Sequence, residues 1–596
     1  VTARSMEVYG PVIESVFQRD GIPAYISRRS DILAKPPLTM LLGAVDAVTG
    51  GFRREDMFRY LKTGMAGITA EECDLLENYV ILWSIRGNMW LRDTEWTANP
   101  DGYGQEMTPE RQQRLAEVNR IREKVRSTLL PLSDGLKDRQ KARDKAEILY
   151  IFAEESGVPQ RLKETAEELL HFLEKSPSSF HAIANITNML EAAGFEEIRE
   201  EENWKLLPGG SYYVTRNQSS VIAFKVPGAD FTGFQIMASH SDSPTFKIKE
   251  NPEMEAAHCI KLNVEKYGGM ICAPWFDRPL SIAGRLVVSE GSRLVSKLVN
   301  VDRDLVMIPN LAIHMNRQVN DGYAYNAQKD MLPVFGSLEA KGTFMSLIAE
   351  AAGVKEEDIL GHDLFLYNRQ PGTIWGADET FLSCGRLDDL QCAFSSVKAV
   401  IEGENSSSIS VAAIFDNEEV GSGTKQGADS TFLKDVLERI NDSLGRTREQ
   451  YLMAVASSFM ISADNAHVVH PNHADVADPT NRPAINEGIV IKYNANQKYT
   501  TDAVSAAVFK ALCKKVQVPV QTFTNRSDIA GGSTLGNISN AHVSLNTVDI
   551  GLPQFAMHSP YETAGVKDTC YLIKAATEFF NSCIVAEGNG NYSLGE

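Results

Sequence analysis

Three acidic residues follow an apolar run in the segment VAAIFDNEEVGSGTKQGA (411–428). The apolar residues predict a buried strand, and Asp416, Glu418 and Glu419 come directly after it. Carboxylates at a buried strand end repel one another and lose hydration, so they require a positive partner, for which a divalent metal ion is the natural candidate. Adjacent glutamates can divide the work, because one can bind the metal while the other acts as general base on water.

Two other segments offer further metal-ligand chemistry. In QIMASHSDSP (235–244), His240 follows a predicted strand and Asp242 comes two residues later. A neutral imidazole binds zinc-like ions, and a nearby carboxylate can orient it. In RLDDLQCAF (386–394), Asp388 and Asp389 stand at a predicted helix start. Taken alone, His240 is better explained as a hydrogen-bonded surface histidine, and the two aspartates as caps of the helix N-terminus.

Asp464 and His558 also end apolar runs, in FMISADNAHVVHPNH (459–473) and FAMHSPYE (555–562). The combined candidate set contains two histidines and three carboxylates: His240, Asp388, Glu419, Asp464 and His558. Such a set suits two divalent ions that share one aspartate.

The elements expected around these residues alternate between strands and helices, which is typical of an α/β domain. Expected strands cover residues 212–216, 220–226, 233–239, 408–416 and 451–464, and expected helices cover 164–176, 181–194, 387–402 and 431–443. Ligands of an open α/β sheet gather beyond the carboxyl ends of its strands, so we expect the acidic and histidine side chains there.

The length of 596 residues predicts more than one domain. Residues 1–165 read as mainly helical, for example over 71–90, and the charged stretch 135–165 predicts an exposed helix or a linker. Residues 166–244 and 379–596 form the expected α/β domain. Residues 245–378, with short alternating runs such as 283–289, predict a β-rich insertion.

Composition narrows the class of protein. The net charge of −19 disfavours general binding to nucleic acid or anionic membranes. The eight cysteines are scattered without a C-x-x-C, which argues against a disulfide framework or a structural zinc site. No apolar run is long enough to span a membrane, and the start VTARSMEVYG lacks a signal pattern. Position 1 is Val, which indicates an alternative start codon or an incomplete N-terminus.

From about 165 to 590 the chain resembles the M18 family of metallo-aminopeptidases, the aspartyl aminopeptidase group. The resemblance rests on HSDSP (240–244), KLNVEKYGGM (261–270), GRLDDL (385–390), FDNEEVGSGT (415–424), SADNAHVVHPN (462–472), NRPAINEGIVIKYNANQKY (481–499) and AMHS (556–559). It implies a mixed-sheet, zinc-peptidase-like catalytic domain that binds two divalent ions, zinc or else manganese or cobalt. The implied ligands are His240, Asp388, Glu419, Asp464 and His558, with Asp388 bridging.

The resemblance also assigns other roles. Glu418 is implied as the general base and Asp242 as the residue that orients the metal site. Asp464 is the implied ligand of its segment, so His467, His470 and His473 are left out of the ligand set. This chain departs from the common family pattern at Ser241, where Thr is usual, at Asp389, where Asn is usual and a charge is therefore added, and at Asn537, where Pro is usual.

In the family, the β-rich insertion is a dimerisation domain, and the histidine of an LAIH segment, here His314, enters the active site of the neighbouring subunit. A structural role for His314 inside its own domain is the alternative. The resemblance implies a homo-oligomer built from dimers, up to a tetrahedral dodecamer.

Peptides are the implied substrates, and an acidic N-terminal residue requires a positive pocket. Lys492 is the candidate for that pocket, with Tyr499 close to it in sequence; the alternative is a solvated strand lysine. Other family members prefer neutral N-terminal residues.

The first 165 residues resemble part of the B subunit of the bacterial AddAB helicase–nuclease, in YGPVIESVFQRDGIPAYISRRSDILAKPPL (9–38), FRYLKTGM (58–65), LLENYVILWSIRGNMW (75–90) and AEILYIFAEESGVPQRL (146–162). The segment has no G-x-x-x-x-G-K-[ST] phosphate loop and no four-cysteine iron–sulfur set, so it is expected neither to hydrolyse ATP nor to cut DNA. A genuine fusion and an assembly artefact both explain it.

The sequence therefore predicts a cytoplasmic metallo-aminopeptidase. Two alternatives are a related dinuclear deacylase, dipeptidase or carboxypeptidase, and a DNA-repair interaction protein acting through residues 1–165.

Overall fold

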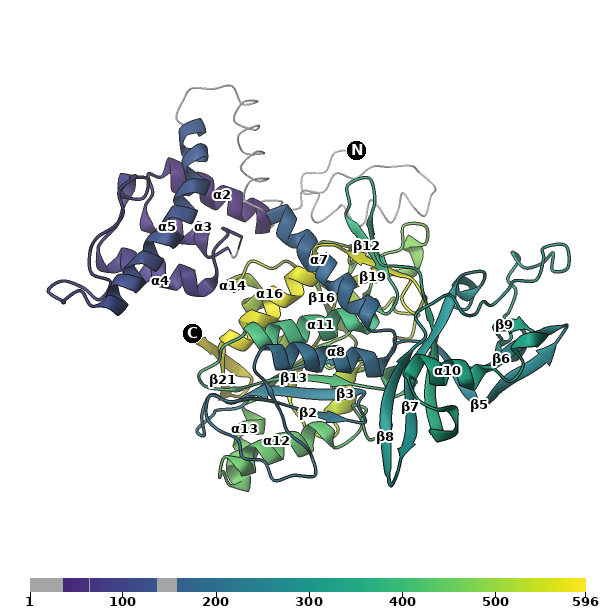
Figure 1. The fold of residues 1–596 in the computed structure, drawn as a ribbon. Coiled ribbons are helices and arrows are strands. Elements are labelled where there is room, and N and C mark those ends of the chain that lie inside the picture. Colours follow the sequence, from purple (N-terminus) through teal and green to yellow (C-terminus); the bar gives the residue numbers. More distant parts are fainter. Residues whose placement is uncertain (1–35, 64, 137–157, 596) are drawn as a thin grey trace. The chain divides into compact units, whose positions relative to one another are not determined.

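The computed structural model describes residues 36–63, 65–136 and 158–595. The chain divides into two compact units, one made of residues 1–164 with 513–519 and the other of residues 165–512 with 520–596. Figure 1 shows the elements of both. The quoted segment 9–38 lies almost entirely outside the described residues, as does most of 146–162 and of the charged stretch 135–165.

The first unit is helical in its described part, as expected. Its helices are α2 (Pro36–Thr49), α3 (Arg54–Leu61), α4 (Ala70–Leu82) and α5 (Pro109–Leu136). The helix expected over 71–90 stops at Leu82, because Ser84 adopts a positive φ of 48°. Trp96 stacks on Tyr79 of α4, with 5.3 Å between ring centroids, and meets Trp90 edge-on, so this core is built around aromatic rings.

A nine-stranded mixed sheet forms the centre of the second unit, in the order β1-β2-β3-β13-β4-β14-β18-β16-β17. The strands are β1 (Glu196–Glu197), β2 (Ser211–Arg216), β3 (Ser220–Lys225), β13 (Ile409–Phe415), β4 (Phe234–His240), β14 (Phe459–Ala463), β18 (Asn546–Gly551), β16 (Ile489–Tyr493) and β17 (Val520–Thr524). The four central strands β13, β4, β14 and β18 run parallel. Their carboxyl ends therefore lie at one edge of the sheet.

Helices cover both faces of this sheet (Figure 1). One face carries α8 (Ser179–Ala192), α11 (Leu387–Glu402) and α16 (Asp568–Asn581), and the other carries α12 (Phe432–Ser443) and α13 (Arg448–Ala456). Alternate residues of β13, namely Val411, Ala413 and Phe415, join Phe432 and Ile440 of α12 in one buried core. The period of two in the strand and the helical spacing in α12 bring these apolar faces together. Other helices of the chain are α7 (Val158–Lys175), α14 (Ala503–Lys515) and α15 (Leu535–Ser539).

The strand predicted over 451–464 is wrong in its first half. Residues up to Ala456 belong to α13, and only Phe459–Ala463 form a strand. A reciprocal capping box between Thr447 and Gln450 starts the helix. This T-x-x-Q signal outweighs the apolar residues that suggested a strand.

An antiparallel sheet of six strands is built from the residues between β4 and α11, in the order β8-β7-β10-β5-β6-β9. Its strands are β5 (Thr245–Ala256), β6 (Cys259–Tyr267), β7 (Leu280–Glu290), β8 (Arg293–Asn300), β9 (Val334–Ser337) and β10 (Ile359–Asn368). With α10 (Phe344–Ala352) it encloses a separate apolar core. We call it the inserted sheet. The expected domain boundaries at 245 and 378 and the dimerisation role stay predictions.

A third sheet of five short strands was not foreseen. It contains β11 (Thr373–Trp375), β12 (Phe381–Cys384), β20 (Glu562–Gly565), β19 (Pro553–Phe555) and β15 (Ala466–His467), in that order. β12 pairs with β20 so that Cys384 lies opposite Glu562. The sheet thereby joins segments that precede or follow Asp388, His558 and Asp464 in the chain. A hairpin of β21 (Cys583–Gly588) and β22 (Asn591–Gly595) follows α16.

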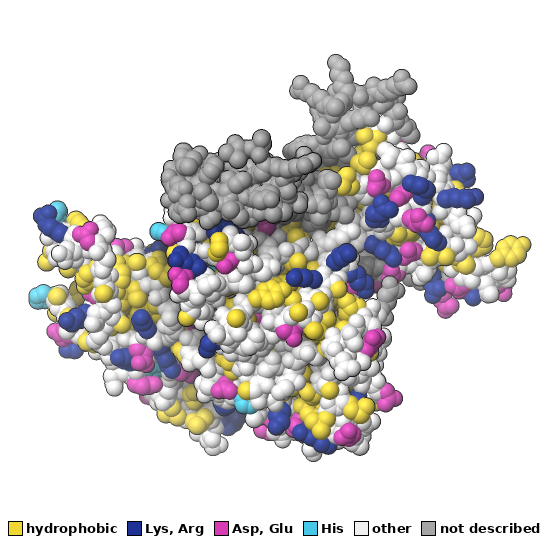
Figure 2. Space-filling view, turned by 180° about the vertical axis from the view of Figure 1, so that it is seen from behind, with side chains coloured by type: hydrophobic (Ala, Val, Ile, Leu, Met, Phe, Trp, Pro, Cys, Tyr) yellow, Lys and Arg dark blue, Asp and Glu magenta, His cyan; other side chains and the backbone are white. Residues whose placement is uncertain are grey.

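Acidic and basic side chains are interspersed on the face shown in Figure 2. Among the helices in the described ranges, none is long and apolar enough to cross a membrane.

Candidate metal centre

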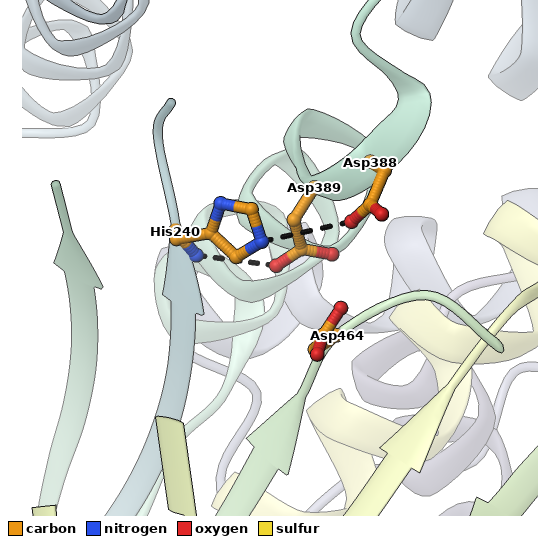
Figure 3. A group of neighbouring side chains, drawn as sticks. All are labelled: His240, Asp388, Asp389 and Asp464. Carbon is orange, nitrogen blue, oxygen red and sulfur yellow. Dashed lines mark hydrogen bonds and ion pairs between the residues drawn. The ribbon is translucent and has the colours of Figure 1, made fainter. Parts of the chain in front are cut away.

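The sheet brings the candidate ligands together at the carboxyl ends of its central strands. His240 is the last residue of β4, and Asp464 directly follows β14, which is parallel to β4. Phe415, the last residue of β13, pairs with His240, so the 416–419 segment begins at the same edge. Asp388 and Asp389 lie at the start of α11, as Figure 3 shows. The position expected from parallel-strand topology is the one observed.

Asp388 lies between the two histidines. Its Oδ1 is 3.6 Å from Nε2 of His240, and its Oδ2 is 3.5 Å from Nε2 of His558. Glu419 completes the second side, with Oε2 3.4 Å from Nε2 of His558. Asp464 groups with His240 and Asp388 on the first side, where the ligand atoms lie within 4.8 Å of one another. One carboxylate therefore faces two separate groups of donors.

Unpaired oxygens at this site favour a bound cation. Oδ1 of Asp388 and Oε1 of Glu419 are buried and have no hydrogen-bond donor. Burial raises the pKa of Glu419 well above its ordinary value, and the neighbouring Asp388 raises it further. A buried carboxylate oxygen without a donor is costly, whereas a divalent ion satisfies it. The imidazole and carboxylate donors are those that zinc accepts, so these residues fit such an ion.

Glu418 lines the cavity at this centre together with His240, Asp388 and Asp464. Burial raises the pKa of Glu418 to about 7. This places its proton affinity near neutral pH, where a general base works best.

Asp242 contacts three residues of the site. Its backbone oxygen lies 3.0 Å from Nδ1 of His240. Its side chain accepts the backbone N–H groups of Glu418 at 3.1 Å and of Glu419 at 3.2 Å. The orienting role implied for Asp242 is compatible with these contacts.

Two neighbours of the ligands were missed by sequence reasoning. Glu562 is buried and accepts the backbone N–H groups of His558, at 2.7 Å, and of Asp388, at 3.0 Å. Tyr267 donates its hydroxyl to Oδ2 of Asp242, at 2.7 Å. In the sequence, Glu562 is marked only as an acidic residue four positions after His558. Tyr267 is marked only by its place in the family-like segment KLNVEKYGGM (261–270).

Asp389 is fully buried, and its Oδ2 accepts the backbone N–H of His240 at 3.1 Å. Burial raises the pKa of Asp389 well above its ordinary value. Its surroundings therefore oppose the extra negative charge that the sequence suggested.

Lys492 and Tyr499, the candidate substrate-binding residues, lie close together at the metal centre. Both line a cavity of about 150 Å³ that also contains His240, Asp388, Glu418, Asp464 and His558. Lys492 is only 3% exposed, so the alternative of a solvated strand lysine is wrong. Its Nζ is 3.4 Å from Oδ2 of Asp464 and 5.5 Å from the centre of the Tyr499 ring.

The remaining histidines lie outside the ligand groups. His314 is exposed in the segment between β8 and α9 (Ala327–Asp330) and is absent from the residues that line this cavity. His467 lines the cavity, but in the described part of the chain it belongs to no group of metal-binding donors, and neither do His470 and His473.

Comparison with known proteins shows the family of the chain. Residues 172–580 match the family model described as aminopeptidase I zinc metalloprotease (M18). The chain belongs to the M18 family. It is 50% identical over 428 residues to a probable M18 family aminopeptidase 2 of Clostridium acetobutylicum, a match that covers 70% of this chain and 99% of the relative. The protein is therefore a zinc metallopeptidase of the aminopeptidase type, a hydrolase.

Two solved structures are similar to this chain in fold. The chain in the cryo-EM structure of the Ape4 and Nbr1 complex is 36% identical, with a TM-score of 0.69, over 70% of this chain and 86% of that chain. The mApe1 dodecamer of S. cerevisiae is 28% identical, with a TM-score of 0.62, over 70% of this chain and 96% of that chain. The M18 match begins at residue 172, so the resemblance of residues 1–165 to an AddAB subunit stays a prediction.

Proposed function

We propose that this M18 aminopeptidase uses two divalent ions, zinc by preference, held by His240, Asp388, Glu419, Asp464 and His558, with Asp388 shared. The observation that carries the proposal is that the two carboxylate oxygens of Asp388 face different histidines, at 3.6 and 3.5 Å. When bound, such ions supply Lewis acidity to the scissile carbonyl and to water.

The residues of the chain account for the proton transfers. Glu418 takes a proton from the attacking water as its oxygen bonds to the carbonyl carbon of the first residue. When the C–N bond breaks, the same carboxyl group returns that proton to the leaving amine nitrogen. Asp242 fixes the backbone of Glu418 throughout.

The test combines metal content with turnover. We expect two zinc ions per chain in elemental analysis of the purified protein. Glu418→Gln should retain both ions and lose about 10²- to 10⁴-fold in kcat, because it removes only the proton acceptor. Glu253→Gln is the control, since Glu253 accepts two backbone N–H groups in the inserted sheet and should leave kcat unchanged. One ion per chain, or undiminished turnover in Glu418→Gln, would contradict the proposal.

We further propose that Lys492 and Tyr499 recognise an acidic N-terminal side chain of the peptide. Burial of Lys492 in the same cavity as Glu418 supports this assignment. The expected cytoplasmic location stays a prediction.

Assembly is proposed from the relatives and from exposed residues. The S. cerevisiae mApe1 structure is a dodecamer, and exposed apolar side chains lie on both sides of His314, at Leu311, Ile313 and Met315. We propose that this chain forms dimers through the inserted sheet, up to a dodecamer, and that His314 enters the site of the partner subunit. The mass of the protein in solution tests the oligomeric state. The peptidase activity of His314→Ala, measured alone and after mixing with Glu418→Gln, tests whether His314 enters the site of the partner subunit.

Two alternative functions are separable by assay. A deacylase or carboxypeptidase accepts an N-acetylated peptide, whereas an aminopeptidase requires the free amine. Salt-dependent binding of DNA by the full chain would support the DNA-repair alternative. The family match favours the aminopeptidase.

A further inference from the structure

The segment that leaves the inserted sheet reaches the metal centre of its own chain. Tyr267 is the last residue of β6 and pairs with Thr245, the first residue of β5. Thr245 lies three residues after Asp242, so the pairing brings the phenol ring beside that carboxylate. The ring packs edge-on against Phe365 of β10, with 5.7 Å between centroids, which limits its movement.

The Tyr267 hydroxyl joins two parts of the site. It donates to Oδ2 of Asp242 at 2.7 Å and accepts from Nδ2 of Asn417 at 2.8 Å. Asp242 in turn accepts the backbone N–H groups of Glu418 and Glu419. Without the hydroxyl, Oδ2 of Asp242 keeps only the longer bond from Glu419, at 3.2 Å.

The next residues contact a second metal-site element. The backbone oxygen of Gly269 lies 2.5 Å from Nδ1 of His558, and the N–H of Ile271 donates to the backbone oxygen of His558 at 3.1 Å. A carbonyl on Nδ1 places the proton there and leaves Nε2, which faces Asp388 and Glu419, free to bind a cation.

We propose that Tyr267 is a positioning residue for hydrolysis: from the inserted sheet it holds Asp242, and through Asp242 it fixes the segment that carries Glu418 and Glu419. The inference rests on the proposed two-metal function. It assigns to the inserted sheet a task within its own chain, in addition to any part in assembly. Tyr267 is not among the residues that line the cavity with Glu418 and Lys492, so its effect is indirect.

The first test compares two tyrosine variants of the full-length protein. Tyr267→Phe removes the hydroxyl and keeps the ring. Tyr367→Phe is the control, because Tyr367 lies in the same sheet and donates to Oδ1 of Asn300 at 2.8 Å. We expect Tyr267→Phe to lower kcat and zinc affinity by about tenfold each, the lower end for residues that orient metal ligands, with KM near the wild-type value. Tyr367→Phe should change neither kcat nor zinc affinity.

A second pair of variants keeps the proposal testable if Tyr267→Phe folds poorly. A Cβ at Gly268 would lie 3.1 Å from Cβ of Glu419, at a φ of +77°. Gly291, in the β7–β8 turn, has a φ of +67° and nothing within 4 Å of its Cβ position. Both alanine variants carry similar backbone strain, so only Gly268→Ala should lower zinc affinity.

The outcomes separate the two proposals. Wild-type protein that binds one zinc ion or none contradicts the proposed function itself. If the wild type binds two ions and hydrolyses peptides, equal kcat and zinc affinity in Tyr267→Phe and Tyr367→Phe overturn the role of Tyr267. Equal zinc affinity in Gly268→Ala and Gly291→Ala would show that the segment after Tyr267 does not constrain Glu419, which contradicts a task of the inserted sheet within its own chain.

Discussion

Replacement of Lys492 by Met tests the origin of substrate selectivity. The change keeps much of the aliphatic stem and removes the ammonium group, which lies in the cavity with Glu418 and His558. We expect the variant to lose preference for an acidic first residue while it still cleaves neutral ones, because only an acidic side chain depends on the positive charge.

The size of the effect follows from the burial of the lysine. Two unit charges about 4 Å apart attract by about 4 kcal/mol at an effective dielectric of about 20. Part of this is offset when the acidic side chain loses hydration, and hydrogen bonds to charged groups contribute about 1.5–3 kcal/mol net. At about 1.4 kcal/mol per factor of ten, the preference should fall roughly 10- to 150-fold.

The assay uses peptides that differ only in Asp or Asn as the first residue. The measured quantity is the ratio of kcat/KM for the Asp peptide to that for the Asn peptide. Loss of the contact between Lys492 and Asp464 alters both values alike, so it cancels in the ratio. Lys225→Met is the control: this lysine lies in β3, and its Nζ donates to the backbone oxygens of Ile401 and Gly403. An unchanged ratio in Lys492→Met would refute recognition of the acidic side chain by this lysine.

Two further predictions concern metal binding. Glu562→Gln should weaken zinc binding about 10- to 100-fold, measured in competition with a chelator. The reason is that an amide accepts only one of the two backbone N–H groups that the Glu562 carboxylate accepts. Glu253→Gln alters the same kind of contact away from the site and should leave zinc binding unchanged. In metal-free protein, burial raises the folded pKa of Asp416 and Glu418 to about 7, so the folded state binds more protons than the unfolded state between about pH 4 and 7. Stability should therefore be highest below about pH 4 for these groups and fall as the pH rises to 7; a melting temperature of the chelated protein that rises between pH 5 and 7.5 would contradict this.

The sequence predicted the elements that carry the ligands because each has a local signal. Apolar runs that end in His240 or Asp464 read as buried strands, and their parallel pairing is the usual outcome of strand–helix alternation. The helix α13 was missed at Thr447, where a short capping signal competed with a longer apolar pattern.

The contacts of Glu562 and Tyr267 could not be predicted from the sequence, because they join distant parts of the chain. Glu562 lies 174 residues from Asp388, and Tyr267 meets Asn417 across 150 residues. Whether such pairs touch depends on strand register, since a shift of one residue turns a side chain to the opposite face. A single sequence gives no periodicity that fixes the register between β12 and β20.

The pairing of β12 with β20 has a consequence for synthesis of the protein. β20 begins at Glu562, whereas Cys384, its partner in β12, lies about 180 positions earlier. A nascent polypeptide on the ribosome therefore contains His240 and Asp388 before β20 is available to pair with β12. Under the proposed function, peptide hydrolysis therefore requires that His558 and the strand after it have been synthesised.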